Sequence, residues 1–252
     1  MPLYRRLIWE VFPVSSVLKL EKVNAYYDKS HILFDLSLEV EEGDSVCILG
    51  RNGVGKSTTM KTIMGIMNPK NHNKTEGQIL LNGENIVGLQ PYAIAQKGIA
   101  YVPQGRHIFS NLTTKENLLI AKKKGIDGSE YWTLEKIYEL FPRLKERETS
   151  MGGRLSGGEQ QMLAVARGLM QNPKIMLLDE ITEGLAPIIV KQLGEIVKEL
   201  TGLGVTILLA EQSVNFAIDV SRKCYILEKG EVVYESATAD LSKETINKYL
   251  GT

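Results

Sequence analysis

Two stretches near the start of the chain alternate apolar with charged or polar residues, which is the pattern of strands with one exposed face. They lie at residues 17–23 and 36–40. A strand pair is also predicted at residues 77–84, because Asn82-Gly83 is typical of a tight hairpin turn. We expect these segments to form one antiparallel sheet.

Five other segments are short and almost wholly apolar, as buried parallel strands are. They cover residues 45–49, 99–104, 174–180, 204–210 and 224–228. Amphipathic helices lie between them. After the first segment, apolar residues from Met60 to Met67 recur on one helical face, and Asn68-Pro69 is expected to end that helix. The pattern predicts an α/β fold with a mainly parallel sheet and helices on both faces.

The sequence changes character between residues 108 and 150. Residues 113–116 have the pattern of a helix capping box, and the charged helical stretch 131–148 is interrupted by Pro142. A helix with a broad apolar face then begins at Ser156-Gly157-Gly158 and is expected to end at Asn172-Pro173. We interpret this region as a helical insertion.

The predicted organisation is an N-terminal arm at residues 1–16 and a single domain at residues 17–252. Within that domain, residues 17–107 and 159–252 form the core with its antiparallel subdomain, and residues 108–158 form the helical subdomain. In the arm, Glu10 and Pro13 interrupt the apolar run after Arg5 and Arg6, which leaves it too short for the core of a signal peptide.

Composition excludes several function classes. Thirty basic and thirty acidic residues give a formal net charge of zero, so no global field favours nucleic acid or anionic lipid. No apolar stretch approaches the roughly 20 residues that span a bilayer, so we expect any membrane association to go through a partner. Cys47 and Cys224 lie in apolar strand segments and are interpreted as reduced core thiols.

The strongest chemical motif is the segment from Gly50 to Thr58, which fits the phosphate-loop pattern G-x-x-x-x-G-K-[ST] at every fixed position. A strand precedes it and a helix follows, so the loop should present backbone N–H groups to an anion at a helix N-terminus. Lys56 would reach the outer phosphates, and the Ser57 hydroxyl would bind magnesium. The loop alone does not distinguish a transporter ATPase from a kinase, a GTPase or a helicase.

Other polar residues follow predicted strands, at the edge where α/β proteins hold their ligands. Gln104 is a candidate ligand, although a plain loop glutamine fits equally well. Asp179 and Glu180 should point in opposite directions, so that one can face magnesium. The aromatic pair Tyr26-Tyr27, in a polar connection, fits either surface packing or a base-stacking face.

Taken together, four segments resemble the nucleotide-binding subunit of an ATP-binding cassette (ABC) transporter, from about residue 17 to the end of the chain. They are Gly50 to Thr58, Gln104, the signature Leu155-Ser156-Gly157-Gly158-Glu159-Gln160, and Leu177-Leu178-Asp179-Glu180. Within this superfamily the chain resembles the LivF-like subunit of branched-chain amino acid importers. That likeness rests on Gly105-Arg106, Ile108-Phe109, Glu183-Gly184-Leu185-Ala186-Pro187, Glu211-Gln212-Ser213 and Tyr249-Leu250-Gly251.

The resemblance implies a role for each candidate site residue. Tyr27 would stack on adenine, and the phosphates would be wrapped by Gly50, Arg51, Asn52, Gly53, Val54, Gly55, Lys56, Ser57 and Thr58. Magnesium would be held by Ser57, Gln104 and Asp179, Glu180 would be the general base, and Gln212 would position the γ-phosphate and water. The other subunit's ATP would be bound by Ser156, Gly157 and Gly158. The family acts as a head-to-tail pair of cassettes.

Three residues depart from the general cassette pattern. Ile181 stands where proline usually follows the catalytic glutamate, Ala186 replaces an aspartate, and Gln212 replaces the switch histidine. The last two also resemble the LivF-like branch. Ile181 keeps the carboxylates but removes the turn restriction that proline would impose.

The implied partners are ATP with Mg²⁺, a second cassette subunit as homodimer or heterodimer, and permeases that dock around Gly105 to Asn117. A solute-binding protein would act indirectly, and no nucleic acid is expected. The protein would lie in the cytoplasm, peripheral on the inner face of the membrane. The solute could instead be urea, an amide or another small polar molecule. A non-transport cassette protein would need a long heptad insertion or two tandem cassettes, and the chain has neither.

Overall fold

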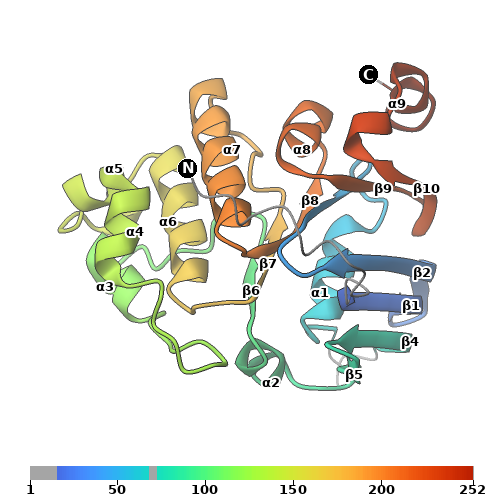
Figure 1. The fold of residues 1–252 in the computed structure, drawn as a ribbon, viewed down its shortest axis with the longest axis horizontal. Helices are drawn as coiled ribbons and strands as arrows, with labels where there is room; N and C mark the ends of the chain where they lie inside the picture. Colours follow the sequence, from blue (N-terminus) through green and yellow to red (C-terminus); the bar gives the residue numbers. More distant parts are fainter. Residues whose placement is uncertain (1–15, 68–72, 252) are drawn as a thin grey trace, which may run out of the picture.

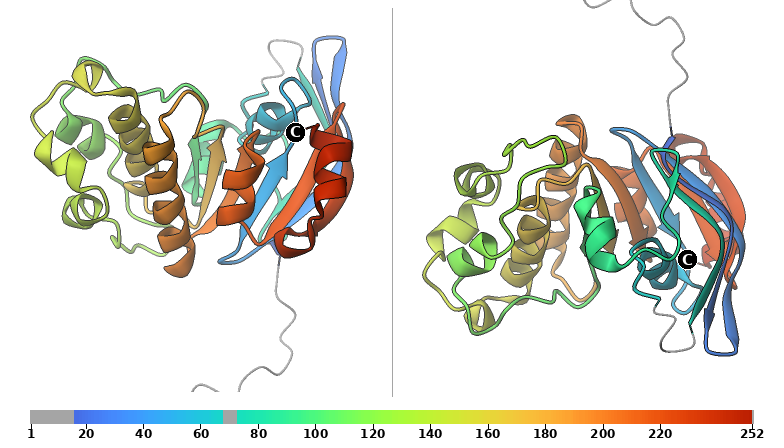
Figure 2. Two further views of the ribbon diagram at one scale, coloured as in Figure 1. Left: turned by 90° about the horizontal axis from the view of Figure 1, so that it is seen from above. Right: turned by 90° about the horizontal axis from the view of Figure 1, so that it is seen from below.

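The computed structural model describes residues 16–67 and 73–251 of the 252-residue chain. Two sheets organise it (Figure 1): a four-stranded sheet in the order β2-β1-β4-β5 and a six-stranded sheet in the order β10-β9-β3-β8-β7-β6. Figure 2 shows the antiparallel sheet and the helical segment around α3, α4 and α5 at opposite ends of the molecule. The six-stranded sheet lies between them.

The four-stranded sheet confirms the predicted alternating strands. It consists of β1 (Ser16–Tyr27), β2 (Ser30–Glu41), β4 (Lys74–Leu81) and β5 (Glu84–Asn85), all antiparallel. Asn82 and Gly83 both have positive φ, 49° and 79°, as the predicted tight hairpin turn requires. Tyr26 and Tyr27 end β1, so placing them in a polar connection was wrong; their aromatic rings favour the strand, and the turn falls at residues 28–29.

In the six-stranded sheet, β3 (Ser45–Leu49), β6 (Ile99–Val102), β7 (Ile175–Asp179), β8 (Thr206–Glu211) and β9 (Lys223–Glu228) are parallel, as predicted. The edge strand β10 (Glu231–Ala237) is antiparallel to β9 and was not predicted. Its apolar run is only three residues long, from Val232 to Tyr234, and all its residues are exposed or half-buried. Cys47 and Cys224 are neighbours in register on β3 and β9, and both are free and buried, as predicted.

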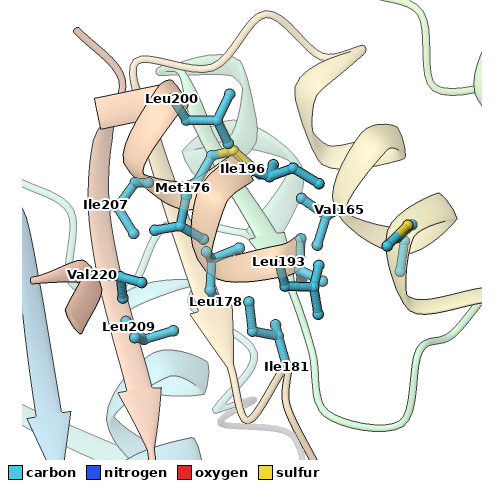
Figure 3. Close-up of a cluster of buried hydrophobic side chains, with 14 of the residues drawn as sticks. Val165, Met176, Leu178, Ile181, Leu193, Ile196, Leu200, Ile207, Leu209 and Val220 are labelled. Atoms are coloured by element: carbon cyan, nitrogen blue, oxygen red, sulfur yellow. The ribbon is translucent and has the colours of Figure 1, made fainter. Parts of the chain in front are cut away.

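Side chains alternate between the two faces of this sheet, and each face has its own core. Helices α6 (Gly157–Leu169), α7 (Pro187–Gly202), α8 (Val214–Val220) and α9 (Lys243–Leu250) cover one face. Figure 3 shows Leu178 and Leu209 of this face against Leu193 and Ile196 of α7. The other face packs against α1 (Lys56–Ile63), α2 (Pro91–Gln96) and the antiparallel sheet. Helices therefore lie on both faces, as predicted.

The helical segment contains α3 (Thr114–Leu119), α4 (Leu134–Leu140), α5 (Pro142–Glu146) and a 3₁₀ turn, η2 (Gly152–Arg154). The predicted capping box is present at Thr113 and Glu116, and α4 and α5 are separated at Phe141-Pro142, as predicted. A second 3₁₀ turn, η3 (Thr238–Asp240), precedes α9. In the ranges 16–67 and 73–251, no helix has both the length and the apolar character needed to cross a bilayer.

Several predicted boundaries were wrong. Helix α1 ends at Ile63, because Gly65 turns the backbone at φ 64°, although Met67 is still buried. Helix α6 ends at Leu169, before the predicted stop. Ser16 belongs to β1, so it is not part of the arm, and the rest of the predicted arm and Asn68-Pro69 lie outside the described residues.

Candidate active site

The phosphate loop joins β3 to α1, and its backbone requires glycine at two positions. A Cβ at Gly50 would lie 2.7 Å from the Leu227 carbonyl oxygen. Gly55 has φ 114°, and a Cβ there would lie 2.8 Å from Leu33. Gly55 is also the N-cap of α1, so the loop closes on a helix N-terminus. A loop of this kind can present backbone N–H groups to an anion.

Lys56 is buried, and three oxygen atoms surround its ammonium group. Nζ donates to the carbonyl oxygens of Gly50, at 2.9 Å, and Arg51, at 3.1 Å. It also forms an ion pair with Glu180, with Nζ 2.9 Å from Oε1. These contacts offset the cost of burying the charge and hold the lysine against its own loop.

Ser57, in the first turn of α1, meets Asp179 at the carboxyl end of β7. Ser57 Oγ donates to Asp179 Oδ1 at 2.9 Å, and the Tyr101 hydroxyl donates to Oδ2 at 3.0 Å. Burial raises the pKa of Asp179, and the hydrogen bonds from Ser57 and Tyr101 oppose that rise. Burial and the nearby Asp179 carboxylate raise the pKa of Tyr101 as well, so its hydroxyl keeps its proton.

Gln104 lines a cavity of about 640 Å³ together with Ser57 and Asp179. Its amide Nε2 donates to Glu180 Oε2 at 2.9 Å and to Glu183 Oε2 at 2.7 Å. The structure thus brings Gln104 into contact with the second carboxylate of the pair rather than the first.

Asp179 and Glu180 face different partners, as predicted, but the cause is not strand alternation. Strand β7 ends at Asp179, and Glu180 has left-handed backbone geometry with φ 46°. Its N–H donates to the Ala210 carbonyl at 2.8 Å. A turn therefore directs Glu180 toward Lys56.

Gln212 follows β8 and lies at the same edge of the sheet. It lines a second cavity, of about 260 Å³, with Glu180, Thr182 and Glu183. Among the residues that the structure describes, no hydrogen bond joins Gln212 to Glu180, so the two share a cavity without direct contact.

Tyr27 ends β1 and is 36% exposed. It pairs with Ser30, and the β2 residues that follow pack on the phosphate loop: the Ile32 carbonyl and the Leu33 side chain both lie within 4 Å of a Cβ built on Gly55. The partly exposed ring therefore lies at the start of the β1–β2 hairpin turn, and β2 continues from this turn to the loop.

The signature residues do not meet the phosphate loop of their own chain. Ser156 caps α6, with a reciprocal capping box to Glu159. Gly157 lies against the Arg106 guanidinium and Gly158 against Ile189. Within the described residues, no hydrogen bond or ion pair joins residues 156–158 to residues 50–58.

Sequence reasoning missed three residues that contact these groups. Tyr101 could have been noticed as a hydroxyl-bearing residue in an otherwise apolar strand. Glu183 was noted in a subfamily motif but not as a partner of Gln104. Glu211 was also noted only as part of a subfamily motif. Its burial depends on the strand order, so no pattern in the sequence indicated it.

A glycine-rich loop between a buried strand and a helix, with a buried lysine and a Ser57–Asp179 pair beside it, defines a phosphate-loop nucleotide-binding protein. Residues 33–183 match the family model described as "ABC transporter". The chain belongs to this family, and it is an ATPase that binds ATP.

Two curated relatives extend over nearly the whole chain. The "High-affinity branched-chain amino acid transport ATP-binding protein BraG" of Pseudomonas aeruginosa is 44% identical over 93% of this chain and 100% of the relative. The "Probable branched-chain amino acid transport ATP-binding protein LivF" of Archaeoglobus fulgidus is 37% identical over 89% of this chain and 94% of the relative.

A solved structure has the same fold. It is the dimeric structure of a post-hydrolysis state of an ATP-binding cassette, bound to ADP and Pi, with a TM-score of 0.73 and 25% identity over 88% of this chain and 98% of that chain. The predicted fold class, a phosphate-loop core with an antiparallel subdomain and a helical insertion, is confirmed.

Proposed function

We propose that this chain is the motor subunit of an ABC importer for branched-chain amino acids. The observation that carries the proposal is the position of Glu180, held between Lys56 of the phosphate loop and Gln104 at the edge of the sheet. The names of the relatives at 44% and 37% identity favour branched-chain amino acids over urea or an amide.

Ser57, Gln104 and Asp179 would hold Mg²⁺ with the nucleotide phosphates. Hydroxyl, amide and carboxylate oxygens are the hard donors that Mg²⁺ prefers, and it usually takes few protein ligands when phosphates are present. The described residues contain no group of three acidic, histidine or cysteine side chains that could hold a metal. The ion would neutralise charge on the phosphates.

Glu180 would accept a proton from the attacking water, and Lys56 would stabilise the charge on the outer phosphates. Gln212 would orient the water and the γ-phosphate, because an amide both donates and accepts hydrogen bonds and does not titrate near neutral pH. Its position in the cavity that contains Glu180 supports this role.

The complete nucleotide site would include a second subunit. Residues 50–58 and Tyr27 of one copy would bind the phosphates and adenine, while Ser156, Gly157 and Gly158 of the other copy would close on the same ATP. The separation of the signature from its own loop supports this arrangement. The second subunit could be a copy of this chain or another cassette.

The segment from Gly105 to Asn117, here called the docking segment, would contact the permease. It begins beside Gln104, and Asn117 fixes its shape through hydrogen bonds to the backbone of Phe109, Leu112 and Thr113. Phe109 is 43% exposed. Through the permease, the chain would lie on the inner face of the membrane, and a solute-binding protein would act from the other side.

Glu180→Gln tests the catalytic assignment. This variant should bind ATP and hydrolyse it at least about 100-fold more slowly, because the base is lost while the phosphate contacts remain. Glu183→Gln is the matched control, since Glu183 also accepts from Gln104, and it should retain most of the activity. Hydrolysis at the wild-type rate by Glu180→Gln would contradict the assignment. The solute is tested in the reassembled transporter, where leucine, rather than urea, should stimulate hydrolysis.

A further inference from the structure

A buried carboxylate that the proposed reaction does not use lies beside the catalytic turn. Glu211, at the end of β8, is 2% exposed. Its oxygen atoms accept two hydrogen bonds from Thr182, one from the backbone N–H at 3.1 Å and one from Oγ1 at 2.9 Å. Thr182 is two residues after Glu180. The carboxylate therefore contacts the turn that carries the proposed base.

The surroundings of Glu211 are unfavourable for a buried carboxylate, apart from the hydrogen bonds that its oxygen atoms accept. The other β8 residues are buried and mostly apolar, and its register neighbour on β3 is Leu49, directly before the phosphate loop. Burial raises the pKa of Glu211 to about 7, against hydrogen bonds from Thr182 and Ser213. Within the described residues Glu211 has no ion-pair partner, so its two hydrogen bonds from Thr182 are the contacts that offset the cost of its burial.

The turn that Glu211 contacts has a strained backbone, and each of its residues 180–182 is held by a hydrogen bond or by packing. Glu180 has a left-handed backbone, which is unfavourable for a residue other than glycine, and its N–H bonds to Ala210. Ile181 is 1% exposed and packs in the core, as Figure 3 shows. Thr182 is held by Glu211. Two consecutive β8 residues thus hold the residues on either side of Ile181.

This arrangement gives a structural reason for Ile181. A residue before proline is disfavoured in helical backbone conformations, so a proline at this position would restrict the turn directly. Here the turn is held instead by a buried apolar side chain and by the bonds from Thr182 to Glu211.

We propose that Glu211, acting through Thr182, is a positioning residue for ATP hydrolysis, which holds the turn so that Glu180 points into the cavity it shares with Gln212. The inference rests on the proposed role of Glu180 as the base. Glu211 also lines this cavity, but its two carboxylate oxygens accept hydrogen bonds from Thr182. Through Thr182 it sets the direction of Glu180. It also directly precedes Gln212, so it is connected to both Glu180 and Gln212 at the cavity.

The test compares variants of Glu211 and Thr182 in the full chain, with kcat and KM for ATP measured separately. Glu211→Ala should lower kcat by about 10-fold or more, because a misplaced base loses much of its effect, with KM changed by less than about twofold. Glu211→Gln retains an acceptor oxygen and should recover most of that loss. Thr182→Val, which has the same shape without the hydroxyl, should lower kcat by about threefold or more, and Thr182→Ser should not.

Asn172→Ala is the control for a purely structural effect. Asn172 is buried and bonds to the backbone of Trp132 and Lys123, away from this site. It should lower the melting temperature without lowering kcat. If Glu211→Ala does not fold, Thr182→Val carries the same test.

Three results would count against the inference, and they are distinguishable. Wild-type kcat in both Glu211→Ala and Thr182→Val, while Glu180→Gln is inactive, would remove the positioning role and leave the proposed function intact. Wild-type kcat in Glu180→Gln would instead remove the base itself, and with it both proposals. A fall in kcat that Glu211→Gln and Thr182→Ser do not recover would also count against the specific hydrogen bonds.

Discussion

Lys56 and Glu180 form a buried ion pair, with side chains 2% and 10% exposed and Nζ 2.9 Å from Oε1. The pair joins the phosphate loop to the turn after β7. Breaking a buried pair by removing one partner leaves an uncompensated charge, which costs about 3–5 kcal/mol in typical cases.

We therefore expect Lys56→Met to reduce the free energy of unfolding by about 3 kcal/mol. Adding Glu180→Gln should recover part of this loss, because no unpaired charge remains. Urea unfolding of the two single variants and the double variant measures the coupling, which should be about 1–3 kcal/mol. Additive effects would mean that the two side chains do not stabilise one another.

Residues that belong to a regular pattern could be predicted from the sequence. The phosphate-loop pattern requires a strand, a turn and a helix in that order, so the positions of Lys56 and Ser57 could be predicted from the local sequence alone. Asp179 was predicted because it ends an apolar strand. The fold class followed from strands alternating with helices.

The remaining contacts depend on strand order, which local patterns do not encode. Tyr101 reaches Asp179 because β6 lies next to β7, and Thr182 reaches Glu211 because β8 lies on the other side. The edge strand β10 has only a short apolar run, and the apolar spacing beyond Gly65 overextended α1. Long-range pairing decides the position of β10 and the contacts of Tyr101 and Thr182, whereas α1 ends at the local turn of Gly65.

Stability should depend on pH through Glu211. Its pKa in the folded protein is about 7, above the usual value of 4.5, so the folded state binds this proton more tightly than the unfolded state. The free energy of unfolding should therefore fall as pH rises from about 4.5 to 7, by up to roughly 3 kcal/mol from this group.

Glu211→Gln cannot titrate, so the difference in stability between this variant and the wild type should change in favour of the variant over the same pH range. Urea unfolding at pH 5, 6, 7 and 8 gives that difference directly. A difference that does not vary with pH would show that Glu211 has an ordinary pKa.

Tyr27→Ala should weaken ATP binding by about 1 kcal/mol, the size of a lost aromatic stack, whereas Tyr27→Phe should change it little. Tyr26→Ala is the control, because the Tyr26 ring already stacks on His31 with centroids 4.1 Å apart. Titration with a fluorescent ATP analogue measures all three variants. Weaker binding in Tyr26→Ala alone would assign the stacking to the wrong ring, and equal loss in both Tyr27 variants would point to the hydroxyl.

Phe109→Asp should abolish co-purification with the permease while leaving basal ATP hydrolysis intact. The Phe109 ring is partly exposed, and the Arg167 guanidinium lies over it, 4.5 Å from the ring centroid. A carboxylate near that guanidinium is tolerated by the fold but is unfavourable in an apolar contact. Tyr92→Asp, at an aromatic residue on α2 that is 68% exposed, is the matched control and should co-purify normally. A fall in the melting temperature of Phe109→Asp, with aggregation, would assign Phe109 to the core instead.

The C-terminal helix contacts the phosphate loop, and this contact should influence ATP affinity. Arg51 Nε donates to the Leu250 carbonyl at 3.3 Å, and a Cβ on Gly251 would overlap the Arg51 guanidinium. Gly251→Ala should therefore displace Arg51 and weaken ATP binding about threefold. It should also lower the free energy of unfolding by about 1 kcal/mol, because φ at Gly251 is 61°.

Gly128→Ala separates these two effects. Gly128 has a similar φ of 78°, but a Cβ there would have no atom within 4 Å. It should lose about the same stability from the backbone and keep wild-type affinity for ATP. Isothermal titration calorimetry and thermal unfolding of both variants distinguish the outcomes. Equal ATP affinity in the two variants would show that the contact between Arg51 and the end of α9 does not position the phosphate loop.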